Sequence, residues 1–219
     1  MSNIFSINDL SNLKVESYDG SNFYWMDNFY VDADLVYDYI TSIEPPIWKD
    51  WESPSHNMVY FEDRRHMINN PDMDICTNPL SKILGQSLSV DFNVVTNFTR
   101  FKKDPFNDYK LNHWWPHNDA GYNAIIYLNK DIKEEFMGTH IYKPLNNEVL
   151  NRSENEHYRP WTSKSDWKIL FSFKAKYNRI VIFDGKKYKH GMDISDDRFF
   201  GDTLENAKFR INQVLFFQE

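Results

Sequence analysis

The amino-acid sequence predicts a mainly β protein with flanking helices, folded as a double-stranded β-helix, the jelly roll also found in cupins. Two observations predict this fold. Short β-branched and aromatic runs bounded by turn residues follow one another through the second half of the chain, and apolar residues at helical spacing precede them. This order is typical of a jelly roll braced by helices. A chain of 219 residues can form one sizeable core, so we expect a single domain over residues 1–219.

The N-terminal part predicts supporting elements, and we assign residues 1–85 to a helical support region. Residues 22–30 form an aromatic, strand-like run. Residues 32–43 follow with apolar residues at helical spacing behind Asp32, which is a suitable N-cap. From residue 45 to residue 79 the chain is rich in Pro, Asn, Asp and Trp and has no sustained period. This composition indicates irregular structure with short helical pieces.

Residues 86–219 are expected to form the jelly-roll core. Its strands are expected in the runs QSLSVDFNVVTNFTRF, HWWPHND, NAIIYLN, GTHIYK, NRIVIFD and AKFRINQVLFFQ. Residues 144–168 interrupt this series with a long, polar and aperiodic stretch. Because a loop of this size in a compact domain often has a function, we expect residues 144–168 to form a lid over the site.

Charge and composition narrow the class of function. The formal net charge is −7 and the sequence pI is about 5.5, which disfavours a nucleic-acid partner because phosphate binding needs a basic surface. Cys76 is the only cysteine, the first residues lack the pattern of a signal peptide, and no apolar run approaches the roughly 18 residues of a membrane span. We therefore expect a cytoplasmic protein without a membrane partner. The sequence leaves the oligomeric state open.

The pattern His117-Asn118-Asp119 is the clearest sign of chemistry in the chain. In an extended segment, residues i and i+2 point to the same side. His117 and Asp119 can therefore offer an imidazole and a carboxylate to one ion, while Asn118 points away. His190 follows the strand RIVIF and the turn DGKK, where a neighbouring strand begins, and is the candidate third ligand. Two His and one carboxylate leave coordination positions open, as in non-heme Fe(II) oxygenases.

An H-x-D triplet alone is weak support, because it occurs by chance in many proteins. The remaining histidines have no acidic residue two positions away, so we treat them as structural, with His113 and His140 as fallback ligands. These residues are His56, His66, His113, His140 and His157.

The last predicted strand carries a second set of candidate residues. Alternation places Lys208, Arg210, Asn212, Val214 and Phe216 on one face, which is polar at one end and apolar at the other. Such a face is expected of a strand that enters a ligand-filled barrel mouth. An inward Arg210 could bind a carboxylate through two parallel hydrogen bonds. An exposed polar stripe on an edge strand explains the pattern equally well, and the sequence leaves both readings open.

Together these residues resemble the 2-oxoglutarate/Fe(II) oxygenase superfamily and, within it, the prolyl-4-hydroxylase-like branch. The resemblance begins at HNDAGYNAIIYLNKD, continues through MGTHIYKP and RIVIFDGKKYKHGMD, and ends in AKFRINQVLFF. It covers about the second half of the chain, with the motifs in the same order. The N-terminal phrase WMDNFYVDADLVYDYI also resembles the strand-then-helix opening of that branch.

The resemblance implies a dioxygenase that hydroxylates a C–H bond with Fe(II), 2-oxoglutarate and O2, supported by ascorbate. It implies that His117, Asp119 and His190 bind the iron and form the catalytic centre. It further implies that Arg210 anchors the distal carboxylate of 2-oxoglutarate with help from Tyr127, while the shared face of the last strand adds Asn212. The substrate would be a small molecule or a peptide, such as a peptidyl proline.

Two departures from the branch leave alternatives open. Arg210 follows His190 by 20 residues, a longer gap than is usual in prolyl hydroxylases, so Lys208 or Arg198 could be the anchor instead. The glycine-bearing strand reads Gly138-Thr139-His140, where the branch has two glycines and an apolar residue. Two other functions stay open: a jelly-roll binding or structural protein without catalysis, and a cupin-like metal enzyme that needs no keto acid. Trp114 and Trp115 are candidates for walls of a substrate groove.

Overall fold

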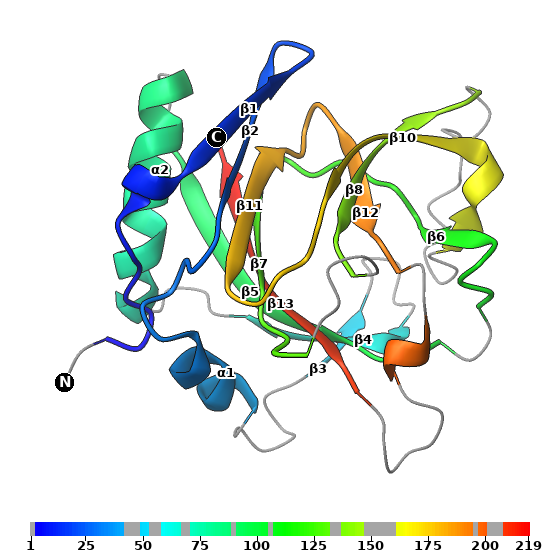
Figure 1. Ribbon diagram of the computed structural model, residues 1–219, viewed down its shortest axis with the longest axis horizontal. Helices are drawn as coiled ribbons and strands as arrows, with labels where there is room; N and C mark the ends of the chain where they lie inside the picture. Colours follow the sequence, from blue (N-terminus) through cyan, green and yellow to red (C-terminus); the bar gives the residue numbers. More distant parts are fainter. Residues whose placement is uncertain are drawn as a thin grey trace.

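The computed structural model describes residues 3–41, 49–52, 58–66, 71–88, 91–104, 107–131, 137–146, 161–194, 197–200 and 208–219 (Figure 1). A large sheet contains β1 (Lys14–Tyr18), β2 (Ser21–Met26), β3 (Lys49–Glu52), β4 (Met58–His66), β5 (Asn93–Phe101), β7 (Tyr122–Tyr127), β11 (Arg179–Asp184) and β13 (Arg210–Gln218). The eight strands are antiparallel and lie in the order β1-β2-β11-β7-β13-β5-β4-β3.

A smaller sheet faces part of the large one. It contains β8 (Thr139–Pro144), β10 (Trp167–Phe173) and β12 (Lys189–Met192) in the order β10-β8-β12. A short pair, β6 (Asn112–Trp114) with β9 (Trp161–Ser163), lies beside it. Buried aromatic and aliphatic side chains fill the space between the sheets, and Phe23 of β2 stacks on Phe171 of β10 at 5.0 Å between ring centroids. The predicted mainly β jelly-roll class is confirmed.

Two helices cover the other face of the large sheet, α1 (Ala33–Thr41) and α2 (Asp74–Leu88), as Figure 1 shows. Val36 and Ile40 of α1 and Leu80 and Leu84 of α2 are buried in one cluster with residues of the sheet. Asp32 caps α1, because its Oδ1 accepts from the backbone N–H groups of Asp34 and Leu35, each at 3.1 Å. Short 3-10 turns occur at Leu10–Asn12, Pro71–Met73, Lys164–Asp166 and Asp197–Phe200.

The region before residue 86 contains more β structure than expected. The stretch from 45 to 79, predicted as irregular, holds β3, β4 and the start of α2, and with β1 and β2 the supposed helical support region adds four strands to the large sheet. The charged run KDWE forms β3 at the sheet edge, where charges discourage pairing with other chains, whereas the charged run EDRRH of β4 pairs with β5 and is followed by β3. Pro79 lies inside α2 although proline usually ends a helix.

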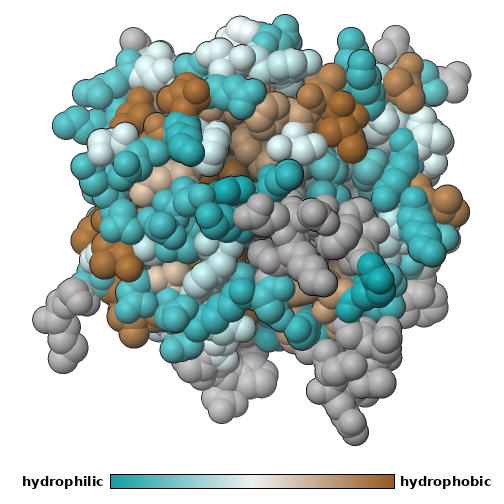
Figure 2. Space-filling model, in the orientation of Figure 1, coloured by the Kyte–Doolittle hydropathy of each residue, from teal (hydrophilic) through white to brown (hydrophobic). Residues whose placement is uncertain are grey.

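The proposed lid over residues 144–168 lies mostly outside the described residues. Its last part, residues 161–168, forms β9, a 3-10 turn and the start of β10. In the described part of the chain, no helix is both long and apolar enough to cross a bilayer. Hydrophilic residues predominate on the face seen in Figure 2, with hydrophobic residues in small groups between them.

Candidate metal centre and ligand cavity

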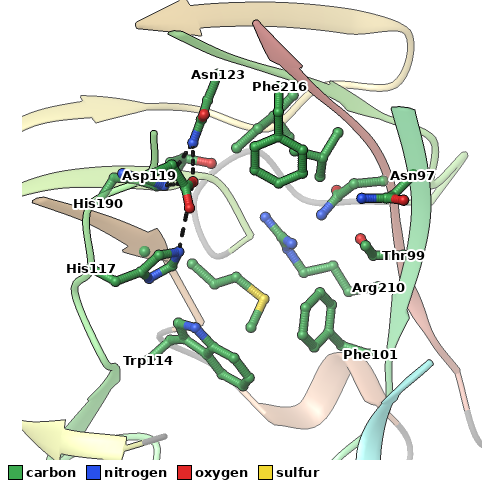
Figure 3. Close-up of a pocket in the computed structure, with 16 residues that line it drawn as sticks. Asn97, Thr99, Phe101, Trp114, His117, Asp119, Asn123, His190, Arg210 and Phe216 are labelled. Atoms are coloured by element: carbon green, nitrogen blue, oxygen red, sulfur yellow. Dashed lines mark hydrogen bonds and ion pairs between the residues drawn. The ribbon is translucent and has the colours of Figure 1, made fainter. Parts of the chain in front are cut away.

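Backbone pairing brings the three predicted ligands together. The His117 N–H donates to the His190 carbonyl at 3.0 Å, and the His190 N–H donates to the His117 carbonyl at 2.9 Å. The Asp119 N–H donates to the carbonyl of Gly185, in the turn between β11 and β12, at 3.0 Å. The side chain of Asn118 turns the other way and donates to that same carbonyl at 3.2 Å. The extended H-x-D segment therefore points His117 and Asp119 to one side, next to His190 (Figure 3).

The ring hydrogen bonds of the two histidines determine which nitrogen faces Asp119. His117 Nδ1 lies 3.1 Å from the Trp115 carbonyl, and His190 Nδ1 lies 3.2 Å from the Tyr188 carbonyl. A carbonyl oxygen can only accept, so each Nδ1 carries the hydrogen and Nε2 of the neutral ring presents a lone pair.

Three acceptor atoms therefore converge. His190 Nε2 lies 3.0 Å from Asp119 Oδ2, and His117 Nε2 lies 3.9 Å from the same oxygen. The three atoms that could bind a metal all lie within 4.8 Å of one another. Lone pairs that face each other at this distance require a cation, either a proton or a metal ion. An imidazole, imidazole and carboxylate set is one that Fe(II) and similar ions accept.

Asn123 of β7 completes the centre and was not predicted. Its Nδ2 donates to Asp119 Oδ2 and lies 2.9 Å from His190 Nε2. Burial alone would raise the pKa of Asp119. When the two histidines are protonated, the hydrogen bond from His190 Nε2, the positive charges of both rings and the bond from Asn123 hold that pKa well below its usual range. Asp119 is thus an anion at neutral pH. The sequence signal for Asn123 was a polar residue on the same strand face as Ile125 and Tyr127.

The candidate metal centre opens into a cavity between the sheets. The cavity offers about 90 Å³ to the centres of water molecules. Because a water needs roughly 10–15 Å³ by that measure, the space holds about six to nine waters. The lining residues are Asn97, Thr99, Phe101, Trp114, His117, Asp119, Asn123, Ile125, Thr139, His190, Gly191, Met192, Arg210, Asn212, Val214 and Phe216.

Arg210 lines this cavity and is 1% exposed, so the reading of the last strand as an exposed stripe is wrong at this position. Its Nε donates to the Met137 carbonyl at 3.1 Å, and its Nη2 donates to the Gly138 carbonyl at 3.0 Å. The side-chain oxygen of Asn212 accepts from Nη1. These contacts hold a guanidinium in the same cavity as the metal ligands.

The alternative anchors are not among the residues that line the cavity. Lys208 is exposed and pairs with Asp131, and Arg198 is also exposed. Among the three basic candidates, only Arg210 could therefore contact a ligand bound in this cavity.

Tyr127 lies behind the cavity wall. It is fully buried, and its hydroxyl donates to Thr139 Oγ1 at 2.9 Å. Burial raises the pKa of Tyr127 to about 12, so the hydroxyl keeps its proton. Thr139 lines the cavity. In the sequence it stands out only as a departure from the two-glycine pattern of the prolyl-4-hydroxylase-like branch.

The two fallback histidines lie elsewhere. His140 Nε2 lies 3.1 Å from Asp193 Oδ1, and the His113 ring packs 4.9 Å from the ring of Tyr142. Neither histidine lines the cavity, whereas Trp114 does and Trp115 does not. The structural assignment of His113 and His140 therefore agrees with their positions.

Comparison with known proteins bears on the fold. No family model and no curated protein sequence matches the chain. Among solved structures, a prolyl-4-hydroxylase from Pseudomonas putida aligns over 90% of this chain and 92% of its own, with a TM-score of 0.55 and 10% identity. The chain has the prolyl-4-hydroxylase fold. A prolyl hydroxylase from Trichoplax adhaerens, solved with a peptide fragment of a hypoxia inducible factor, aligns over 90% of this chain and 83% of its own, with a TM-score of 0.50 and 11% identity.

The prolyl-4-hydroxylase fold confirms the predicted resemblance at the level of structure. At this identity the likeness concerns the fold alone, because one fold can host many chemistries. The roles of the site residues therefore depend on the geometry of this chain.

Proposed function

We propose that the chain is an Fe(II)- and 2-oxoglutarate-dependent dioxygenase that hydroxylates a C–H bond of its substrate. The observation that carries the proposal is that three converging acceptor atoms, on His117, Asp119 and His190, share one cavity with the buried guanidinium of Arg210. A small dicarboxylic keto acid matches this arrangement, because one end can chelate a metal while the other carboxylate meets Arg210.

The donor set fits a non-heme iron. Both Nδ1 atoms donate to backbone carbonyls, and such outer hydrogen bonds orient histidine ligands and fix their tautomer. Asn123 holds the Asp119 carboxylate in the same way. When bound, the iron would supply the activation of O2, with ascorbate as a supporting reductant. The protein's own residues orient the ligands and exclude water.

Arg210 would bind and orient the co-substrate. Its contacts with Met137, Gly138 and Asn212 fix the plane of the guanidinium before any ligand arrives. Thr139, which accepts a hydrogen bond from Tyr127, can direct its own hydroxyl hydrogen into the cavity. A peptidyl proline and a small metabolite both stay candidate substrates, and the fold alone supports the first.

The test is anaerobic titration with Fe(II) and 2-oxoglutarate, which should give the weak visible band of the chelate. Changing Arg210 to Met should weaken 2-oxoglutarate binding on the order of 10²-fold, since hydrogen bonds to charged groups contribute about 1.5–3 kcal/mol each. The matched change Lys208→Met should have no effect, because Lys208 is exposed and does not line the cavity. A folded wild-type protein without the band would refute the proposal. Succinate formation that survives Arg210→Met would mean that Arg210 is not the anchor, and substrate turnover without any succinate would favour an enzyme that needs no keto acid.

A further inference from the structure

Two side-chain oxygens of β5 line the cavity without a hydrogen-bond partner among the described residues. Asn97 and Thr99 are each 3% exposed, and Asn97 Oδ1 and Thr99 Oγ1 make no hydrogen bond. Nearly all buried polar atoms in folded proteins are hydrogen-bonded, because an unpaired one destabilises the fold. Two such atoms two residues apart on one cavity wall therefore point to a ligand group that pairs with them.

The register of the large sheet separates this wall from the proposed co-substrate site. Thr99 lies opposite Asn212 and Asn97 lies opposite Val214, so β13 stands between β5 and β7. Asn123, which contacts the metal ligands, is on β7, and Arg210 is on β13. A molecule that joins the metal centre to Arg210 can lie along β7 and β13 and leave the β5 wall to a second molecule. Figure 3 shows Asn97 and Thr99 on the strand beside Arg210.

The chemistry of the wall restricts that second molecule. Asn97 and Thr99 carry no charge, and the cavity residues Phe101 and Val214 beside them are apolar, while Asn212 lies opposite Thr99. With Arg210 paired to the co-substrate and Asp119 at the metal, a second carboxylate or an ammonium group would find no opposite charge left among the lining residues, and a purely apolar substrate would leave both oxygens unpaired. An uncharged group with both a donor and an acceptor satisfies them.

We propose that Asn97 and Thr99 bind an amide group of the substrate. This inference rests on the proposed function, in which Arg210 and the metal hold the co-substrate. Residues i and i+2 of a strand lie roughly 6.6 Å apart on the same side, so the two side chains can bracket one amide. Asn97 Oδ1 accepts from the amide N–H, and the Thr99 hydroxyl donates to the amide carbonyl. The amide belongs either to a small molecule or to a peptide backbone.

The first measurement is the thermal midpoint of the ligand-free protein. Thr99→Val keeps the shape of the side chain and removes an oxygen that has no protein partner and can pair only with water in the ligand-free cavity, so the midpoint should stay within about 2 °C of wild type. Thr139→Val is the matched control in the same cavity, because its hydroxyl accepts a bond from Tyr127, and it should lower the midpoint. A midpoint that falls for Thr99→Val as it does for Thr139→Val would overturn the proposal.

The second measurement follows the Asn97 side-chain amide in ¹⁵N NMR spectra, assigned by its loss in Asn97→Leu. The probes are blocked single amino acids, blocked tetrapeptides and matched esters that lack the amide N–H, added to protein loaded with Zn(II) and 2-oxoglutarate. Amide probes should shift the Asn97 signal and esters should not, and Thr99→Val should weaken amide binding at least fivefold. A response to the single amino acids identifies a small amide, and a response to tetrapeptides alone identifies a peptide.

The two proposals fail separately. If no amide probe moves the Asn97 signal, or if Thr99→Val weakens 2-oxoglutarate binding more than tenfold, the wall does not bind a substrate amide. If the wild-type protein does not bind 2-oxoglutarate at all, the proposed function fails. The same amide probes on the metal-free protein then still decide whether the β5 wall recognises an amide.

Discussion

Gly138→Ala tests how closely the fold and the ligand cavity depend on each other. A Cβ atom at position 138 would lie 1.9 Å from the carbonyl oxygen of Phe173, 3.0 Å from its carbonyl carbon and 3.2 Å from the Ala175 nitrogen. All three atoms belong to the backbone, so no side chain can rotate away. Ordinary contact begins at 3.4 Å, and the β8 and β10 backbones would have to separate by about 1.5 Å (3.4 minus 1.9).

The expected cost is large because the paired residues next to the clash, Thr139 and Phe173, are both buried. Overpacking in a core costs about 1–3 kcal/mol, and a clash of backbone with backbone belongs at the upper end, about 3 kcal/mol. For a protein of this size 1 kcal/mol shifts the thermal midpoint by about 2–4 °C, so the midpoint should fall by about 6–12 °C. The Gly138 carbonyl accepts from Arg210 Nη2, so 2-oxoglutarate binding should weaken as well.

Thermal unfolding followed by circular dichroism, with calorimetric titration of 2-oxoglutarate, measures both effects. Gly20→Ala is the comparison, because Gly20 has a φ of 72° and open space around its Cβ position. It should cost only the left-handed strain of about 1 kcal/mol and leave ligand binding unchanged. A Gly138→Ala protein that melts within 2 °C of wild type would refute the packing argument (about 0.5–1 kcal/mol by the same scale).

Three further predictions concern buried groups. Tyr127→Phe should remove the hydrogen bond to Thr139 and lower the free energy of unfolding by about 1 kcal/mol. It should weaken 2-oxoglutarate binding less than Arg210→Met does. An equal loss of affinity would mean that Tyr127 contacts the ligand directly. Burial, with the nearby charges of Lys164 and His140, lowers the pKa of His113 to about 4. In the unfolded chain the pKa of a histidine is about 6.5, so as the pH falls below that value His113 is protonated in the unfolded state before it is protonated in the folded state. The free energy of unfolding of the wild type should therefore fall by about 2 kcal/mol between pH 7 and pH 5 because of His113. Urea titrations should show a smaller fall over the same pH range for His113→Gln than for the wild type. Burial raises the pKa of the Cys76 thiol to about 12, and a thiol reagent should label Cys76 only at the rate of unfolding, as timed labelling in native buffer would reveal.

Local composition and turn residues were sufficient to predict the strands of the second half. The runs that became β5, β7, β8, β11 and β13 combine β-branched and aromatic residues with clear turn boundaries. The strands β3 and β4 were missed because charged residues hide their period. An edge strand such as β3 is paired on one side only and tolerates charges, while β4 pairs with both β3 and β5 in spite of its charged run EDRRH. The sequence could not reveal this, since strand pairing is a property of the complete sheet.

In the candidate site, too, some residues could be predicted from the sequence and others could not. His117 and Asp119 were predicted from their spacing together with the family resemblance, because a strand-like segment places i and i+2 on one side. Arg210 stood between two readings until its burial was known. Asn123, Thr139, Asn97 and Thr99 carry ordinary polar side chains on strands, and only the pairing of those strands brings them into one cavity.

One peptide group connects the two halves of the proposed site. The Gly138 carbonyl accepts from Arg210 Nη2 and from the Asp193 N–H, each at 3.0 Å, and Asp193 lies three residues after His190. The strand that carries the candidate metal ligand His190 and the side chain that would anchor the co-substrate are therefore fixed to the same atom. Any shift of that carbonyl moves both, so a change at Gly138 should weaken metal and 2-oxoglutarate binding together. Loss of one without the other would mean that the two ends of the cavity are held independently.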